Sequence, residues 1–125
     1  NKERKLENDS SIVLLGNIDN YSFLLMGDAS IETEQEILKK YRLPSLLFLK
    51  VGHHGSKTST SFSLLNELTP RYSFISVGEK NFYGHPSPNV ISLLNQFSKT
   101  IYMTSKDGSI FIKFRKNVTF LRFPP

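Results

Sequence analysis

Short apolar runs alternate along the chain with amphipathic segments, a pattern typical of strands that alternate with helices. Apolar residues dominate positions 11–16 and 21–26, and the stretch 17–20 between them predicts a hairpin of two buried strands. Further strands are predicted over 45–51, 71–77, 100–104, 109–115 and 118–123, and helices over 31–41, 60–68 and 88–97. This order predicts an α/β fold, in which polar residues at strand ends usually form the functional site.

Two of the predicted helices have clear start signals. Ser30 is suited to be an N-cap, because acidic side chains follow it at 32 and 34 and basic ones stand at 39, 40 and 42, which complements the helix dipole. Ser87 precedes Pro88, and proline is favoured at the first helical position because the N–H it lacks would be unpaired there.

The amino-acid composition limits the class of protein to which the chain can belong and the residues that could bind a metal. The 125 residues form one domain or a piece of one, and a first residue other than methionine indicates a piece of a longer protein. The longest apolar runs fall far short of the ~18–20 residues of a membrane helix, and no secretory signal is visible. Cysteine is absent, so disulfides and thiolate metal sites are excluded, and a metal would need His, Asp, Glu or Asn ligands.

The net charge of +5 is unevenly distributed. Residues 1–43 hold 6 basic and 8 acidic side chains, whereas residues 44–125 hold 10 basic and 3 acidic ones. A basic half is typical of a surface that binds a polyanion, because lysine and arginine replace condensed counterions on phosphates. The alternative is a mildly basic domain without such a partner, so the charge indicates a class of partner and nothing narrower.

The first candidate site residue is Asp28, which follows the apolar run 21–26 after a single glycine. A carboxylate at this position is held by a rigid strand and is available to a ligand. The alternative is that Asp28 caps the helix predicted to begin three residues later.

The second candidate is the segment 51–59, in which His53 and His54 follow a buried strand and precede Ser56, Lys57 and Thr58. Imidazole can bind a metal, transfer a proton or hydrogen-bond a phosphoryl oxygen. The helix start that follows adds unpaired backbone N–H groups, which favour an anion. The alternative is a polar turn with two surface histidines.

The third candidate is the loop 78–88, which contains Tyr83 and His85 and could equally be a proline- and glycine-rich loop with an exposed histidine. If the preceding strands are parallel, their ends meet at one sheet edge. Asp28, His54 and His85 are then expected to converge within a few ångströms. Two divalent ions bridged by a carboxylate and held by imidazoles would form a hydrolytic site there.

Together these segments resemble the metallo-β-lactamase superfamily, and more closely the extracytoplasmic β-lactamase-like domain of ComEC-type competence proteins, the DNA-import channels of natural transformation. The resemblance runs through nearly the whole chain, and the His-His-Gly-Ser and Tyr-Gly-His-Pro segments are specific for this branch. It rests on Asn8, Ser10 and Asn81 and on the segments 24–28, 50–59, 76–78 and 83–86.

The resemblance implies that residues 1–125 form the carboxy-terminal half of a four-layer αββα sandwich, with a mixed sheet and flanking helices. The superfamily's main His/Asp metal motif would lie upstream of Asn1, so little or no catalysis is expected from this chain alone. Relatives often have histidine where Ser87 stands and aspartate where Ser105 stands, and neither departure removes an implied ligand.

By the same resemblance, Asp28 bridges two divalent metal ions, Mn²⁺ or Zn²⁺, and His85 completes a metal site. His53 and His54 line the pocket as catalytic groups that orient phosphate or as ligands, and the resemblance does not fix which of them faces the metal. Contacts to the substrate are expected from Ser56, Lys57, Thr58 and Tyr83.

The implied function is that of a metal-dependent phosphodiesterase, a nuclease that degrades the DNA strand that is not imported. The alternatives are a non-catalytic module that guides DNA, which the basic residues in 113–122 would serve equally well, and a hydrolase of a small phosphodiester. The expected partners are DNA, the membrane channel of the same polypeptide and, through the truncated apolar face, a second copy of the chain. The expected location is outside the cytoplasm, as a domain of a bacterial membrane protein.

Overall fold

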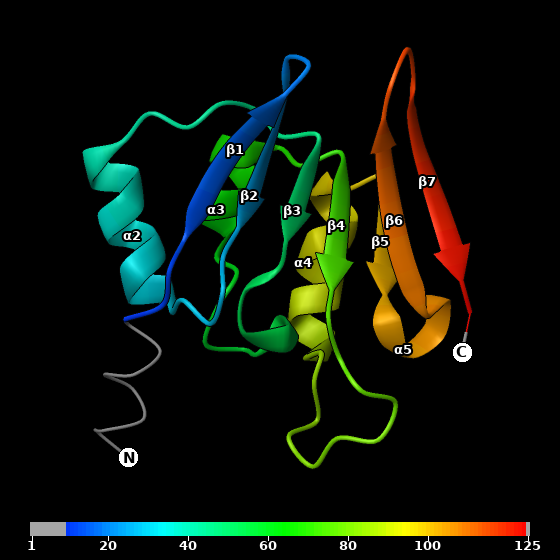
Figure 1. Cartoon of the computed structure of the whole chain (residues 1–125). Coiled ribbons are helices and arrows are strands. Elements are labelled where there is room, and N and C mark those ends of the chain that lie inside the picture. Colours follow the sequence, from blue (N-terminus) through cyan, green and yellow to red (C-terminus); the bar gives the residue numbers. More distant parts are fainter. Residues whose placement is uncertain (1–9, 125) are drawn as a thin grey trace.

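The sheet that carries the candidate residues has five strands in the order β1-β2-β3-β4-β5 (Figure 1). The computed structural model describes residues 10–124. β1 and β2 form an antiparallel hairpin, whereas β2 to β5 pair in parallel. The strands are β1 (Leu14–Ile18), β2 (Tyr21–Leu25), β3 (Phe48–Lys50), β4 (Tyr72–Ile75) and β5 (Thr100–Met103). The mixed sheet with flanking helices confirms the predicted α/β class.

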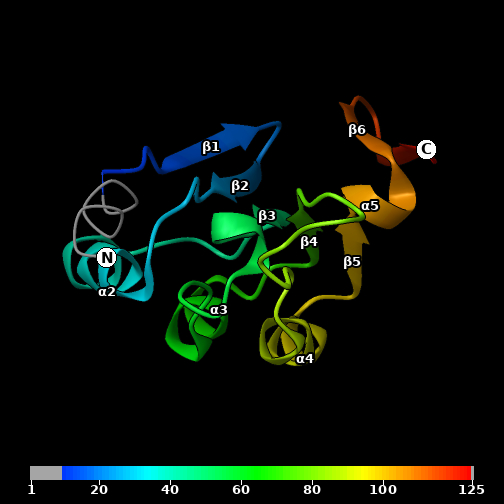
Figure 2. The ribbon, with the colours of Figure 1, turned by 90° about the horizontal axis from the view of Figure 1, so that it is seen from below.

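A helix joins each pair of parallel strands. α2 (Ile31–Lys40) connects β2 to β3, α3 (Phe62–Leu68) connects β3 to β4, and α4 (Pro88–Phe97) connects β4 to β5. Figure 2 shows these three helices side by side on one face of the sheet. The space between the two layers is filled mainly by buried aliphatic side chains, among them Leu24, Leu49, Leu65, Ile75 and Leu94.

The helix start signals act as the sequence predicted. The hydroxyl of Ser30 caps α2 by accepting the N–H of Thr33, so Asp28 is not the cap and the alternative interpretation of that residue is wrong. Ser87 is the N-cap of α4, and Pro88 is its first residue. The prediction that a helix begins at residue 60 is wrong, because Thr60 has a left-handed backbone (φ 66°) and Ser61 is the N-cap of α3.

The opposite face of the sheet is partly covered by a second hairpin, β6 (Ser109–Phe114) and β7 (Val118–Phe123). Figure 2 shows this hairpin on the side away from the helices. Aromatic rings fill the contact: Phe48 meets Phe74 edge-on with centroids 5.4 Å apart, and Phe120 lies 6.0 Å from Phe74. The chain therefore has one aliphatic core and one aromatic core, on the two faces of one sheet.

The prediction of two buried strands in the first hairpin is wrong for β1. Leu14 and Ile18 are 50% and 41% exposed, because β1 is an edge strand and, within residues 10–124, pairs with β2 alone. The polar break is also shorter than predicted. Strand pairing continues to Ile18 and Tyr21, and Asp19 and Asn20 make a two-residue turn with positive φ.

A short helix, α5 (Thr104–Asp107), joins β5 to β6, and the Asp107 carboxylate supports it by accepting the N–H of Met103 and pairing with Arg122. Asn8, one of the residues that carry the resemblance, lies outside the described residues. Within 10–124, every helix is too short or too polar to cross a bilayer.

Candidate functional site

The three candidate segments meet at one edge of the sheet. β2, β3 and β4 are parallel neighbours, so the residues that follow them, 26–28, 51–59 and 76–87, leave the sheet at the same end. Backbone hydrogen bonds join the segments: the N–H of His53 donates to the carbonyl of Gly27, and the N–H of Ser87 donates to the carbonyl of Gly55. This edge is the lower one in Figure 1.

The two adjacent histidines lie in a tight turn, the 3-10 segment η1 (Gly52–Gly55). Both have left-handed backbones, with φ of 45° at His53 and 54° at His54. Such a conformation is unfavourable for a residue with a Cβ, and it persists only where surrounding contacts impose it. Here the N–H of Ser56 donates to the carbonyl of His53, and the buried hydroxyl of Ser59 donates to the carbonyl of Gly52. The turn therefore fixes the directions in which the two side chains leave the backbone.

His54 is held between a backbone carbonyl and a carboxylate. Its Nδ1 atom lies 2.7 Å from the carbonyl oxygen of Ser76, and its Nε2 atom lies 3.7 Å from a carboxylate oxygen of Asp28. A carbonyl can only accept, so Nδ1 carries a proton and donates it. In the neutral ring, Nε2 then presents its lone pair toward Asp28. Two acceptors that face each other at this distance can share a cation, either a proton on Nε2 or a metal ion.

His53 and His85 extend the row of imidazoles. The His53 ring lies 6.3 Å from the His54 ring and 5.8 Å from the His85 ring, measured between centroids. Tyr83 stacks on His85 at 5.7 Å with the two rings within 16° of parallel. The structure thus arranges Asp28, His54, His53 and His85 in a continuous series, the first link being Nε2 to carboxylate and the others ring to ring.

The loop that carries His85 is fixed by one amide side chain. The amide nitrogen of Asn81 donates to the carbonyls of Gly78 and His85, and its oxygen accepts the N–H of His85. Asn81 therefore closes the loop at its base and fixes the backbone from which the His85 imidazole extends.

Two charged groups at this edge have shifted pKa values. Burial lowers the pKa of His85, and the nearby His53 and His54 lower it further by like-charge repulsion. This favours the neutral ring, which is the form that binds a metal or accepts a proton. Burial also lowers the pKa of Lys50, while the carboxylate of Asp28 opposes that change. Lys50 therefore lies within electrostatic reach of Asp28.

Three residues of the histidine segment are predicted to contact the substrate, and they differ in exposure. Lys57 and Thr58 are exposed, whereas Ser56 is buried and its hydroxyl lies 3.0 Å from that of Thr58. The hydroxyl of Thr58 is also 3.5 Å from Nδ1 of His53. The buried Ser56 hydroxyl thus contributes to the structure of the turn. Lys57 and Thr58 are the two residues that a substrate in solvent could contact.

The donor set fits part of a metal site. Nε2 of His54 and the carboxylate of Asp28 are about half exposed, and a metal-binding histidine commonly donates its other nitrogen to a carbonyl, as His54 does to Ser76. Within residues 10–124, however, no three His, Asp or Glu side chains are grouped closely enough to hold an ion. A complete coordination shell would need ligands from outside these residues.

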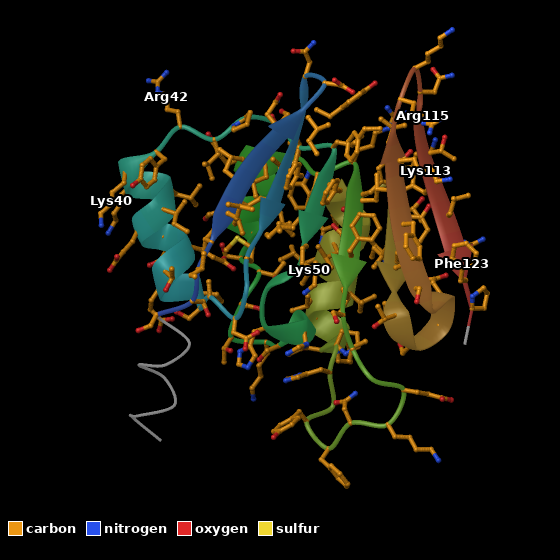
Figure 3. The ribbon with its side chains drawn as sticks, viewed as in Figure 1. Lys40, Arg42, Lys50, Lys113, Arg115 and Phe123 are labelled. Carbon is orange, nitrogen blue, oxygen red and sulfur yellow. The ribbon has the colours of Figure 1, made fainter. Side chains whose placement is uncertain are left out.

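Sequence reasoning missed two residues at this edge. Lys50 ends β3, half-buried, and its ammonium donates to the carbonyl of Val51 (Figure 3). Its signal was a lysine directly after the apolar run 46–49. Phe82 is fully exposed in the loop beside Tyr83, and its signal was a large apolar residue in an otherwise polar loop.

Comparison with known proteins places the chain within much longer relatives. It is 38% identical to ComE operon protein 3 of Bacillus subtilis over 120 residues, which are 95% of this chain and 16% of that protein. It is 34% identical to Recombination protein 2 of Haemophilus influenzae over 110 residues, 88% of this chain and 14% of that protein. It is 32% identical to Competence protein ComA of Neisseria gonorrhoeae over 106 residues, 83% of this chain and 15% of that protein.

The chain therefore spans only about one-seventh of the length of these relatives. No protein-family model and no solved structure matches it. The similarity to each relative covers more than four-fifths of this chain, which includes the candidate site. The chain is thus homologous to one segment of the ComEC-type competence proteins.

Proposed function

We propose that this chain is part of a competence protein for DNA uptake in natural transformation, and that it contributes to a metal-dependent phosphodiesterase site that cleaves DNA. Two of the similar proteins bear names that support such a role, a competence protein and a recombination protein. The observation that carries the proposal is the His54–Asp28 pair, in which Nδ1 of the imidazole is occupied by the Ser76 carbonyl and Nε2 faces a carboxylate.

In this proposal the residues at the sheet edge have different roles. Two divalent ions, Mn²⁺ or Zn²⁺, would supply the Lewis acidity that polarises a phosphodiester. Asp28 and His85 would hold them, and His54, which faces Asp28, would be a further imidazole ligand or a proton acceptor. His53 orients a non-bridging phosphate oxygen, supported by the hydroxyl of Thr58.

The remaining ligands come, in this proposal, from a part of the polypeptide outside the chain, as in a metallo-β-lactamase sandwich of which this chain is the carboxy-terminal half. The incomplete ligand set of residues 10–124 is consistent with that division. The domain would lie outside the cytoplasm, next to the membrane channel of the same protein.

Cleavage by the full-length protein tests the proposal. Linear duplex and single-stranded DNA are incubated with Mn²⁺ and the wild type, Asp28→Ala, His85→Ala or Glu36→Ala. Glu36 is a matched control, because its carboxylate is exposed on α2 and pairs only weakly with Lys40, at 3.9 Å. We expect cleavage by the wild type and Glu36→Ala, and its loss in the other two variants. Cleavage that survives Asp28→Ala would overturn the proposal.

A second candidate is a module that binds and guides DNA without cutting it. Two observations favour it: the incomplete ligand set, and the exposed Lys113 and Arg115 on the second hairpin. Figure 3 shows these two basic residues toward the end of the molecule opposite the loop 78–86. DNA binding without cleavage under any divalent metal, with an affinity that falls as salt rises and is unaffected by Asp28→Ala, would establish this function instead.

A further inference from the structure

The loop between β4 and α4 presents aromatic rings to solvent. Phe82 is completely exposed, and Tyr83 is 75% exposed. Figure 1 shows this loop extending beyond the lower edge of the sheet, farther than the neighbouring turns. A lone exposed apolar residue is common, but two consecutive aromatic residues at the tip of a projecting loop mark a contact surface.

The loop is held in a defined shape. Asn81 ties its two ends together through the carbonyls of Gly78 and His85 and the N–H of His85. One face of the Tyr83 ring is stacked on His85, and the Phe82 side chain makes no ring contact within the described residues. The Phe82 ring is therefore exposed on a loop whose base is fixed. The next residue, Tyr83, contacts His85, the last imidazole of the series.

The charges around the tip suit a phosphate backbone. Lys80 is exposed in the same loop, and Lys57 is exposed in the histidine segment, which contacts the loop through the His53 and His85 rings. Glu79 is the acidic residue of the loop. A row of imidazoles, two lysines and two aromatic rings thus lies at one edge of the sheet.

We infer that the loop 78–86 is a base-stacking platform for single-stranded nucleic acid, with Phe82 and Tyr83 stacking on bases and Lys80 and Lys57 contacting phosphates. Aromatic stacking needs an open base face, which a single strand offers and an intact duplex does not. The strand then runs from the platform toward His85 and His53. This inference rests on the proposed function and narrows its substrate to a single strand at the site.

Binding by the full-length protein in EDTA, which prevents metal-dependent cleavage, tests the inference. Fluorescence anisotropy is recorded with a labelled oligothymidylate and with a blunt duplex of equal length. The variants are Phe82→Ala, Phe82→Trp and, as a matched control, Phe111→Ala. Phe111 is also an exposed phenylalanine, at 54%, but it lies on β6 and meets only Phe123 among the rings of the described residues.

We expect Phe82→Ala to weaken binding of the single strand about tenfold, which corresponds to the loss of one stacked base. Phe82→Trp should keep the affinity, and Phe111→Ala should leave it unchanged. The affinity for the duplex should be the same for all four proteins. Since Phe82 is fully exposed, its variants should unfold at the temperature of the wild type.

Three results would overturn the inference in distinguishable ways. If the wild type binds the oligothymidylate and Phe82→Ala binds it equally well, stacking at Phe82 is wrong while the proposed function stands. If the wild type binds neither nucleic acid in EDTA but cleaves DNA with Mn²⁺, the platform is wrong and the proposed function stands. If it neither binds nor cleaves, both fail. Vesicles of phosphatidylglycerol and phosphatidylethanolamine provide a further arm: binding lost in Phe82→Ala, with binding of the single strand intact, would assign the loop to a membrane surface.

Discussion

The Nε2 atom of His54 lies 3.7 Å from the carboxylate of Asp28, while the Nδ1 atom of the same ring lies 2.7 Å from the carbonyl oxygen of Ser76. The carbonyl thereby selects the tautomer, because only a protonated Nδ1 can donate to it. A left-handed backbone at His54 holds the ring in this place. The result is an imidazole of defined orientation whose Nε2 faces the Asp28 carboxylate, with both groups half open to solvent.

This pair predicts a loss of divalent-metal affinity when either member is removed. In the full-length protein, Asp28→Asn and His54→Gln should each weaken binding of Mn²⁺ or Zn²⁺ at least tenfold, because the first removes the negative charge of the carboxylate and the second removes the imidazole nitrogen. Isothermal titration at constant pH measures the change. Glu36→Gln is the control and should bind the metal like the wild type. Unchanged affinity in Asp28→Asn would show that the carboxylate does not face the ion.

Removal of the Lys50 charge is predicted to raise the affinity for a divalent metal ion. Its ammonium lies within electrostatic reach of Asp28 and therefore competes with a cation for the carboxylate. Lys50→Met keeps most of the half-buried stem and removes the charge, so affinity for a divalent ion should rise several-fold, and more at low salt than at high salt. Lys57→Met, which removes an exposed lysine, should have little effect on the same titration. A weaker affinity in Lys50→Met would mean that the lysine supports the site.

The sequence predicted that the candidate residues share one sheet edge, whereas the expected convergence of Asp28, His54 and His85 is not met. Within residues 10–124, His85 neighbours His53, and no three His, Asp or Glu side chains are grouped closely enough to hold an ion. His53, His54 and His85 could be assigned to one edge because three apolar runs end just before the three polar segments, and parallel pairing of those runs brings their ends together. The parallel pairing itself was a condition of that prediction, and the structure meets it: β2, β3 and β4 are parallel neighbours joined by helices, the kind of crossover that parallel strands require. These inferences depend on the local pattern and the order of elements.

The details that failed depend on contacts across the fold. Leu14 and Ile18 are as apolar as a buried strand, but β1 is at the sheet edge, and nothing in a single strand's pattern tells an edge from a centre. Thr60 interrupts the predicted helix with a left-handed backbone, and its N–H donates to the carboxylate of Glu34, a residue 26 positions away. The turn conformation of His53 and His54 is likewise set by tertiary hydrogen bonds.

Glu34 predicts a pH dependence of stability. Its carboxylate is fully buried and accepts the N–H groups of Thr60 and Ser61, and burial raises its pKa above the ordinary value of 4.5. A raised pKa in the folded state means that the folded chain binds the proton more tightly than the unfolded chain. The contribution of the protonated Glu34 to the free energy of unfolding is therefore fully present below pH 4.5. It is lost as pH rises through the pKa that Glu34 has in the folded state.

The matched variant isolates this effect. Relative to Glu34→Gln, which does not titrate, the wild type should lose free energy of unfolding as pH rises from 4.5, by at most about 1.4 kcal/mol per pH unit. Urea unfolding of both proteins across that range measures the difference, in which all other titrations cancel. A difference that stays constant with pH would contradict the burial of an ionisable carboxylate at this position.

Gly55 predicts a mutation that disturbs both the fold and the site. Its φ is +78°, and a Cβ there would lie 2.6 Å from Cβ of Pro86. Gly84 is the matched control, because its φ is +68° but an added Cβ would meet nothing within 4 Å. Gly84→Ala should cost about 1 kcal/mol, the penalty of a left-handed alanine, and Gly55→Ala about 1–3 kcal/mol more, because it also overpacks against Pro86.

The two glycine variants should also differ in function. In Gly55→Ala, Pro86 must move away from the histidine turn, and it takes His85 with it, so the spacing between the His53 and His85 rings must change. We therefore expect metal affinity to fall in Gly55→Ala and to remain near that of the wild type in Gly84→Ala. Thermal unfolding and metal titration of both variants measure the two effects. Equal loss in both would mean that backbone strain matters and the contact with Pro86 does not.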